Sequence, residues 1–137
     1  MSFGAAASLP RGRRLVETAP CPCGGGSFGT CCGPILDGRP ATGPEQVMRS
    51  RYTAFALGDA RHLQESWSPR TRPDEMTLDE TTEWLGLTVE EATEDGARGT
   101  VRFRAQWRDS TSGERGELAE HSRFHRVAGR WYYLDAL

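Results

Sequence analysis

The chain contains no lysine, since all 17 of its basic residues are arginine. Catalysis through a lysine Schiff base, a P-loop lysine or a lysine general base is therefore excluded. The chain also has no apolar run approaching the roughly 18 residues of a membrane-spanning helix, so we expect no membrane partner. Its 137 residues are too few for an ordinary barrel enzyme or doubly wound enzyme, and they favour one domain with at most a small appendage.

Charge of one sign is not in excess, because the formal net charge is −2, and this argues against a general polyanion binder. The charges are nevertheless segregated: nine acidic and no basic residues lie within 74–95, whereas eight arginines lie within 98–130. We expect these two segments to neutralise each other across neighbouring strands. The alternative is a functional arginine face for phosphate or RNA, formed by Arg102, Arg104 and Arg108.

The first 20 residues are rich in Ala, Gly and Arg, and they lack the pattern of a secretory signal. Such a signal has a basic head followed by roughly 7–15 apolar residues, whereas the apolar pair Leu15-Val16 is far shorter. We predict a disordered leader over residues 1–20 and a cytoplasmic protein. In that reducing compartment, clustered cysteines bind metal more often than they form disulfides.

The four cysteines lie within twelve positions, at Cys21, Cys23, Cys31 and Cys32. Four thiolates complete the tetrahedral coordination of a structural Zn2+ site and leave no position for an activated water. We expect backbone N–H groups to donate hydrogen bonds to the thiolates, and Phe28 to cover one side. Alternatives remain open: a disulfide pair or redox switch, an Fe–S centre, or no metal. Disulfides would have to cross the cluster, because adjacent cysteines bridge each other only with strain.

The cysteine segment reads C-P-C-G-x-G-x-F-x-x-C-C-G and resembles the SEC-C motif, a zinc-binding module also found at the C-terminus of the SecA translocation ATPase. Further motifs follow: MRSRYTAF at 48–55, WSP at 67–69, WLGL at 84–87, E-x-S-x-F at 120–124 and WYY at 131–133. Together they make the chain similar to the YchJ-like family (UPF0225), in which a SEC-C motif is joined to an NTF2-like domain.

This resemblance implies a SEC-C-like zinc knuckle over residues 21–36 and an NTF2-like domain over residues 42–137. The chain departs from the family pattern where Gly25 replaces the usual Ser and Ser68 replaces the usual His. The second, C-terminal SEC-C motif of some members is also absent. By analogy with SecA, the resemblance implies contact with a protein or the ribosome.

Three helices are expected from start signals and helical spacing. The first begins at a capping box formed by Thr42 and Glu45 and ends at Gly58. A second, shorter helix is predicted over about 59–67, with its first residue as the cap. Another capping box predicts a third helix over about 77–84.

Beyond the third helix, the apolar period changes to two. Strands are predicted over about 85–89, 101–107, 117–127 and 130–134. Helices followed by an antiparallel sheet indicate the α+β class. The NTF2-like cone, a curved antiparallel sheet wrapping a helix, fits this order and agrees with the resemblance.

NTF2-like cones often hold a cavity between the sheet and the first helix, so the resemblance also suggests a pocket. Alternation along the third strand places Glu120 and Ser122 on the same inward side as Phe124. A buried carboxylate needs a partner, and we predict an ion pair between Glu120 and Arg51 of the first helix. The candidate pocket comprises Arg51, Tyr52, Trp67, Trp84, Glu120, Ser122 and Phe124.

The leading hypothesis is a non-catalytic zinc-binding protein that docks a partner and carries an NTF2-like partner- or ligand-binding domain. The alternatives are an enzyme or small-ligand carrier using Glu120, and RNA binding through the arginine face. No Ser–His–acid arrangement is visible around the three imidazoles, and a homodimer through the open sheet face is a further hypothesis. Ligand binding requires an open cavity that reaches Glu120, whereas docking requires an exposed apolar patch near the knuckle.

Overall fold

The computed structural model describes residues 9–137, so residues 1–8 of the predicted leader lie outside the described part. Its sheet is an antiparallel meander in the order β1-β2-β3-β4. The strands are β1 (Thr82–Asp95), β2 (Arg98–Asp109), β3 (Arg115–Val127) and β4 (Arg130–Ala136). Among residues 9–137, no helix is both long and apolar enough to cross a membrane.

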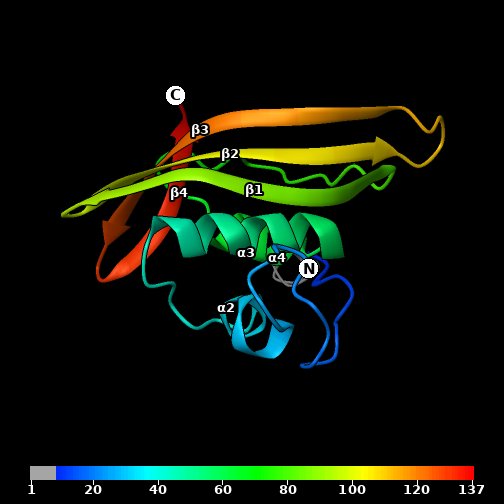
Figure 1. Cartoon of the computed structure of the whole chain (residues 1–137). Coiled ribbons are helices and arrows are strands. Elements are labelled where there is room, and N and C mark those ends of the chain that lie inside the picture. Colours follow the sequence, from blue (N-terminus) through cyan, green and yellow to red (C-terminus); the bar gives the residue numbers. More distant parts are fainter. Residues whose placement is uncertain (1–8) are drawn as a thin grey trace, which may run out of the picture.

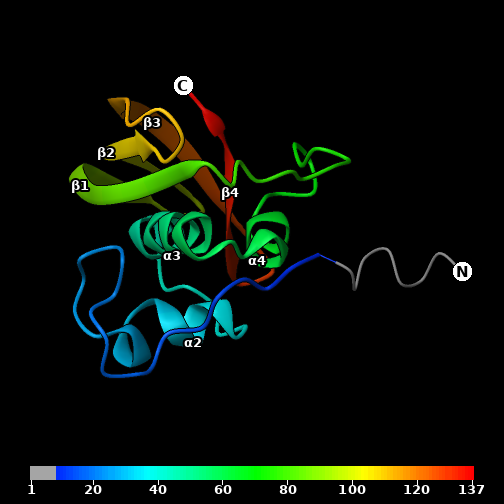
Figure 2. The ribbon, with the colours of Figure 1, turned by 90° about the vertical axis from the view of Figure 1, so that its right-hand side faces the viewer.

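Two helices lie against one face of this sheet, and a third layer lies behind them (Figures 1 and 2). The helices on the sheet are α3 (Pro44–Leu57) and α4 (Ala60–Glu65). The third layer contains the 3-10 turn η1 (Phe28–Thr30) and α2 (Cys32–Leu36). Helix α3 is therefore enclosed between the sheet and the cysteine segment. The predicted α+β class, with helices packed on an antiparallel sheet and an N-terminal cysteine cluster, is confirmed.

The capping box predicted at the start of α3 is wrong. The helix begins one residue later than predicted, with Gly43 as N-cap and no side-chain cap. The backbone N–H of Thr42 instead donates to Oε1 of Gln46 at 2.7 Å. Because Pro44 at the first helical position fixes φ without needing a hydrogen bond, it sets the start without a serine or threonine cap. The other end is as predicted, since Gly58 is left-handed with φ 79.

The second predicted helix is present, and the third is absent. Asp59 caps α4 by accepting the backbone N–H of His62 at 2.9 Å. Residues 77–81 form no helix, because Asp79 binds the backbone and side chain of Thr81 in a local turn. Strand β1 then begins at Thr82, and its pairing with β2 outweighs the local helix-start pattern. The remaining strand predictions are confirmed, and β1 and β2 are longer than predicted.

Irregular pairing curves the sheet around α3. Strand β1 shifts register between Trp84 and Gly86 and again between Val89 and Glu91. A third shift occurs where β3 meets β4, after Arg123. Each bulge increases the local twist and bends the strand. The face of the sheet that is turned toward α3 is therefore concave, and the inward side chains lie on it.

The segment 9–20 differs from the predicted disordered leader, because its backbone is tied to the helical layer. The N–H of Arg13 donates to the carbonyl of Leu57 at 2.8 Å, and the carbonyl of Pro10 accepts the N–H of Arg61 at 3.1 Å. The composition of this segment alone does not reveal these hydrogen bonds. Backbone groups exposed at the end of α3 find partners in this segment.

The cysteine segment and the cone share one hydrophobic core. Cys21, Cys23, Phe28 and Cys32 pack in the same buried cluster as the inward residues of α3 and of the sheet. This cluster extends without interruption to Phe124. The predicted knuckle is therefore packed against α3 and the sheet, in contrast to a module on a free linker.

Candidate metal centre and internal cavity

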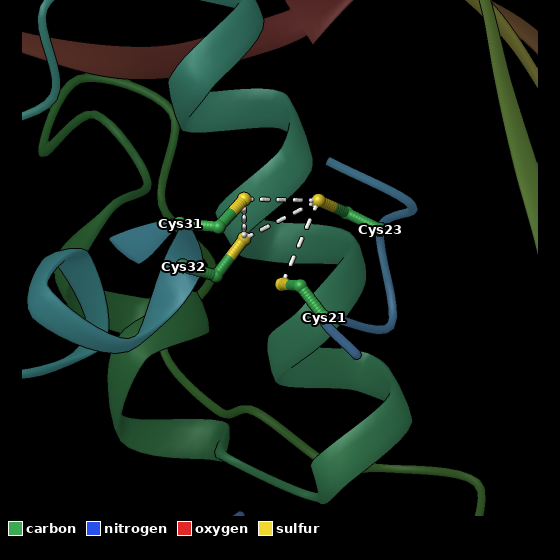
Figure 3. A group of neighbouring side chains, drawn as sticks. All are labelled: Cys21, Cys23, Cys31 and Cys32. Atoms are coloured by element: carbon green, nitrogen blue, oxygen red, sulfur yellow. Dashed lines mark hydrogen bonds between the residues drawn. The ribbon is translucent and has the colours of Figure 1, made fainter. Parts of the chain in front are cut away.

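The four cysteine side chains converge beside α3. Cys21 and Cys23 precede η1, Cys31 and Cys32 lie at the start of α2, and Figure 3 shows all four pointing toward one another. Their Sγ atoms all lie within 4.8 Å of one another. The sulfur pairs that contact each other are separated by 3.4–3.9 Å, and all four cysteines are free.

These separations match the edges of a zinc–thiolate tetrahedron. With Zn–S bonds of about 2.3 Å, neighbouring sulfurs in such a tetrahedron lie about 3.8 Å apart. Four sulfurs in this arrangement are also a donor set that suits zinc. The residues present therefore fit a structural metal ion whose coordination sphere is filled by protein, and such an ion would stabilise the fold without binding a reactive water.

The pKa of one cysteine thiol is lowered, and the pKa values of two others are raised, by hydrogen bonds and burial. Hydrogen bonds from Cys23 and Cys32, including their backbone amides, lower the pKa of Cys21. Hydrogen bonding to Cys21 raises the pKa of Cys32, and burial raises that of Cys31 to about 12. Four adjacent thiolates repel one another, and a divalent cation that replaces the thiol protons removes this repulsion.

Side chains of α3 hold the cluster from behind. Oγ1 of Thr53 donates to Sγ of Cys32 at 3.3 Å, and Nη1 of Arg49 donates to the carbonyl of Cys23 at 2.8 Å. Phe28 is buried in the hydrophobic core that contains Cys21, Cys23 and Cys32, and its cover of one side of the sulfurs stays a prediction. Such outer contacts orient metal ligands and tune their basicity.

The backbone at Gly25 passes close to two of the sulfurs. A Cβ at this position would lie 2.9 Å from Sγ of Cys31 and 3.2 Å from Sγ of Cys23. The departure from the usual Ser at this position therefore gives the cluster room. Gly24 and Gly26 have φ of 83 and 118, angles that turn the loop around the site.

A cavity of about 350 Å3 lies on the other side of α3, against the concave face of the sheet. Its lining includes every predicted pocket residue: Arg51, Tyr52, Trp67, Trp84, Glu120, Ser122 and Phe124. They come from α3, the loop after α4, β1 and β3. The inward orientation predicted for β3 is thus confirmed, and the structure brings the whole set together.

The predicted ion pair between Arg51 and Glu120 is wrong. No carboxylate of residues 9–137 lies within 4.0 Å of the Arg51 nitrogens. Nη1 of Arg51 instead donates to the carbonyl of Leu63 and to Oγ of Ser66, both at 2.8 Å. The end of α4 thus supplies neutral acceptors for Arg51, which the spacing of residues along α3 did not reveal.

Tyr133 separates the two charged groups. Its ring centroid lies 4.5 Å from Cζ of Arg51, and its hydroxyl donates to Oε2 of Glu120 at 3.5 Å. Ser122 also donates to Oε2 of Glu120, at 2.6 Å. Burial raises the pKa of Tyr133 to about 12, so its hydroxyl remains a donor at neutral pH.

Several lining residues were not included in the predicted pocket. Tyr133 is the most important, and the motif at 131–133 contained a signal for it because alternate residues of a strand share a face. The other missed residues are apolar side chains of α3, β2 and β3: Met48, Phe55, Phe103, Ala105 and Leu118. Their positions depend on the curvature of the sheet, which the apolar period does not specify.

The imidazoles do not complete a catalytic arrangement in the described part of the chain. His62 Nε2 lies 2.8 Å from Oγ of Ser50, but that hydroxyl donates to the carbonyl of Val47. Nε2 must then donate to Ser50, so it cannot accept the serine proton. Burial lowers the pKa of His62 to about 4, which agrees with a neutral ring. His125 contacts Ser68 in a second Ser–His pair, away from the cavity.

The arginine face is largely neutralised across strands, as predicted. Arg104 pairs with Glu90 at 2.9 Å and with Glu117 at 2.6 Å, and Arg108 pairs with Glu83 at 3.2 Å. These pairs join β2 to both of its neighbours. Of the three arginines of this face, Arg102 alone forms no ion pair among the described residues, which leaves one unpaired positive charge for a nucleic acid.

The fold and the cysteine cluster together define an NTF2-like protein with a SEC-C motif. The family model that matches is the middle NTF2-like domain of YchJ, over residues 43–136. A UPF0225 protein of Xanthomonas oryzae pv. oryzae is 49% identical over 121 residues, covering 85% of this chain and 93% of that protein. A UPF0225 protein of Streptomyces coelicolor is 45% identical over 125 residues, covering 88% and 96%. The chain belongs to the YchJ-like family, UPF0225.

Two solved structures share the fold. The solution structure of a SEC-C motif protein from Rhodopseudomonas palustris matches with a TM-score of 0.76 at 37% identity, covering 85% of this chain and 96% of that one. The crystal structure of a SEC-C motif protein from Psychrobacter arcticus matches with a TM-score of 0.70 at 26% identity, covering 88% and 81%.

Proposed function

We propose that this protein is a non-catalytic binding protein that takes a small organic ligand into the cavity between α3 and the sheet. A Zn2+ ion held by the four cysteines stabilises the helix that forms one wall of this cavity. The observation that carries the proposal is the cavity itself, which has a volume of about 350 Å3. Most of its lining is aromatic or aliphatic, and Arg51 and Glu120 are its charged residues. Ligand pockets of roughly 300–1,000 Å3 with few polar groups have this character.

The distribution of exposed apolar side chains supports a ligand more than a docked partner. Phe55 and Leu118 are exposed and also line the cavity, so apolar surface gathers around its rim. In the described part of the N-terminal segment, Val16 is the only large exposed apolar side chain. Docking of a protein through the knuckle, which the SEC-C resemblance implies, therefore stays a prediction without a supporting surface.

Structural zinc is supported by the sulfur geometry and by the shared core. The test of the metal is native mass spectrometry of reduced, freshly purified protein. We expect one zinc ion per chain, and none in a Cys31→Ser, Cys32→Ser variant. Protein that is folded and free of metal, or that carries an iron–sulfur chromophore, would contradict the proposed centre.

The ligand site is tested with a neutral apolar probe. Indole binding is measured by saturation-transfer NMR in the zinc-loaded full chain and in an Ala105→Phe variant, which fills the cavity. The control is Ala119→Phe, because Ala119 is exposed and does not line the cavity. We expect binding to weaken at least tenfold in Ala105→Phe only. Indole binding that is equally strong in the two variants would overturn the proposed function.

A further inference from the structure

Arg51 is a buried cation with unused hydrogen-bond donors. The residue is 7% exposed. The two hydrogen bonds that its side chain donates, to Leu63 and Ser66, both come from Nη1. Within residues 9–137, Nε and Nη2 have no acceptor. Its guanidinium lies 5.0 Å from the ring centroid of Trp67 and 4.5 Å from that of Tyr133, which leaves its edge free for a ligand.

The charge of Arg51 is balanced only in part by protein, because Glu120 acts on it through space without forming an ion pair. Burial lowers its pKa to about 10, yet it is still charged at neutral pH, and no carboxylate of the described residues pairs with it. Aromatic faces compensate a cation only in part. A buried cation without an ion pair costs free energy. An anion that enters the cavity would therefore gain an ion pair with Arg51 that no carboxylate of the described residues forms.

A second group in the cavity also lacks a partner. Oε2 of Glu120 accepts hydrogen bonds from Ser122 and Tyr133, whereas Oε1 accepts none from the described residues. In addition, the Nε1–H of Trp67 is buried and finds no acceptor in the part of the chain that is described. Among the described residues, the cavity thus presents donors of Arg51 and an oxygen of the half-buried Glu120 that have no protein partner, beside the buried, unsatisfied Nε1–H of Trp67.

The geometry points to a small aromatic carboxylic acid, bearing a hydroxyl or amino donor, as the ligand class. Its carboxylate would bind the free edge of Arg51, and its donor would reach Oε1 of Glu120. Its ring would lie among the rings of Tyr52 and Trp84. Because Arg51 is the one cationic residue among the described residues that line the cavity, its single charge matches a carboxylate better than a doubly charged phosphate. This assignment rests on the proposed function.

The test compares isosteric ligands on the zinc-loaded wild-type chain by isothermal titration calorimetry. We expect 2-naphthoate to bind on the order of tenfold to hundredfold more tightly than neutral 2-naphthamide, as a charge-assisted hydrogen bond implies. We expect 6-hydroxy-2-naphthoate or 3-hydroxy-2-naphthoate to bind more tightly than 2-naphthoate. An amide that binds as tightly as the acid would overturn the inference, as would hydroxy acids that both bind no better than 2-naphthoate.

Two variants separate the roles of the charged groups. Arg51→Gln should abolish the preference for acid over amide, and Glu120→Gln should reduce the advantage of the hydroxyl. The control Arg102→Gln alters an exposed arginine outside the cavity and should change neither. If Arg51→Gln fails to fold, the 15Nε resonance of Arg51 in the wild-type chain replaces it, and this resonance must shift with naphthoate but not with naphthamide.

The outcomes also distinguish this inference from the function on which it rests. If indole binds in the cavity but acids have no advantage, the ligand-binding function stands and the assigned ligand class is wrong. If neither indole nor any naphthalene probe binds, both are wrong.

Discussion

The two sides of α3 are built by opposite rules. On one side, Arg49 and Thr53 contact the cysteine segment, where the four sulfurs all lie within 4.8 Å of one another. On the other side, Met48 and Arg51 line a cavity of about 350 Å3. We call the first the closed side, because its sulfurs pack against one another, although Cys31, Cys32 and Arg49 also line a surface groove there. We call the second the open side, and the same 14-residue helix supplies both walls.

This difference shows where the stability of the helix comes from. An empty volume beside a helix forgoes packing contacts, and deleting buried groups typically costs about 2–5 kcal/mol for a large aliphatic side chain. Metal binding to a folded cluster contributes directly to folding. The closed side can therefore hold α3 in place while the sheet side stays open for a ligand.

The largest predicted effect is on the closed side. Removal of zinc with a chelator should abolish the cooperative unfolding transition of the whole chain, because the cysteines share one core with the sheet. Apparent binding energies of structural zinc, about 10–16 kcal/mol, are comparable with the whole stability of a domain. Near-UV circular dichroism and amide exchange check this. Loss of protection confined to residues 21–36, with the cone still cooperative, would show that the two sides are independent.

A smaller effect is predicted at the third contact of α3, where Ser50 meets His62. Burial, with a contribution from Arg51, lowers the pKa of His62 to about 4. Between pH 6.5 and 4 the unfolded state then binds more protons than the folded state, so stability falls as pH falls through this range. From pH 7 to 5, the loss from His62 should be on the order of 2 kcal/mol.

The comparison that isolates this loss is with His62→Gln, which does not titrate. Both proteins keep the four cysteines of the proposed zinc site, so acid protonation of the thiolates affects them equally. Urea unfolding at pH 7 and pH 5 should show a smaller pH effect in the variant. Identical pH effects would mean that His62 is protonated in the folded state.

The closed side could be predicted from sequence more completely than the open side. Four cysteines within twelve positions specify a local cluster, because any loop that brings them together must turn within the same segment. Its connection to the rest of the fold could not be predicted in this way. The contact between Thr53 and Cys32 joins residues 21 positions apart, and nothing local in the sequence marks it.

The prediction of the open side depended on both the apolar period of the strands and the family resemblance. Alternation placed Glu120, Ser122 and Phe124 on one face, and the structure confirms it. Alternation did not reveal that α4 would supply acceptors for Arg51, so the ion pair with Glu120 was wrong. The false third helix at 77–84 has a similar origin, since a local start signal lost to pairing between β1 and β2.

Thr53 offers a way to weaken the closed side alone. Thr53→Val keeps the shape of this fully buried side chain but removes its hydrogen bond to Cys32. We expect zinc affinity to fall by roughly tenfold to hundredfold, as for other outer contacts of metal ligands. The matched control is Ser122→Ala, which removes a buried hydroxyl on the open side and should leave zinc affinity unchanged. Competition with a chromophoric chelator measures both, and equal losses in the two variants would contradict the separation.

The smallest effect on stability is predicted at the rim of the open side. Phe55 is 42% exposed and lies 6.1 Å, centroid to centroid, from Trp84. Phe55→Ala should lower the free energy of unfolding by only about 1 kcal/mol, because part of its apolar surface already contacts water. The same change should weaken indole binding several-fold and leave zinc affinity unchanged. Val127→Ala, at a similarly exposed position outside the cavity, should leave indole binding at the wild-type level. A loss of several kcal/mol in Phe55→Ala would mean that the rim is part of the packed core, and that both sides of α3 contribute to holding it.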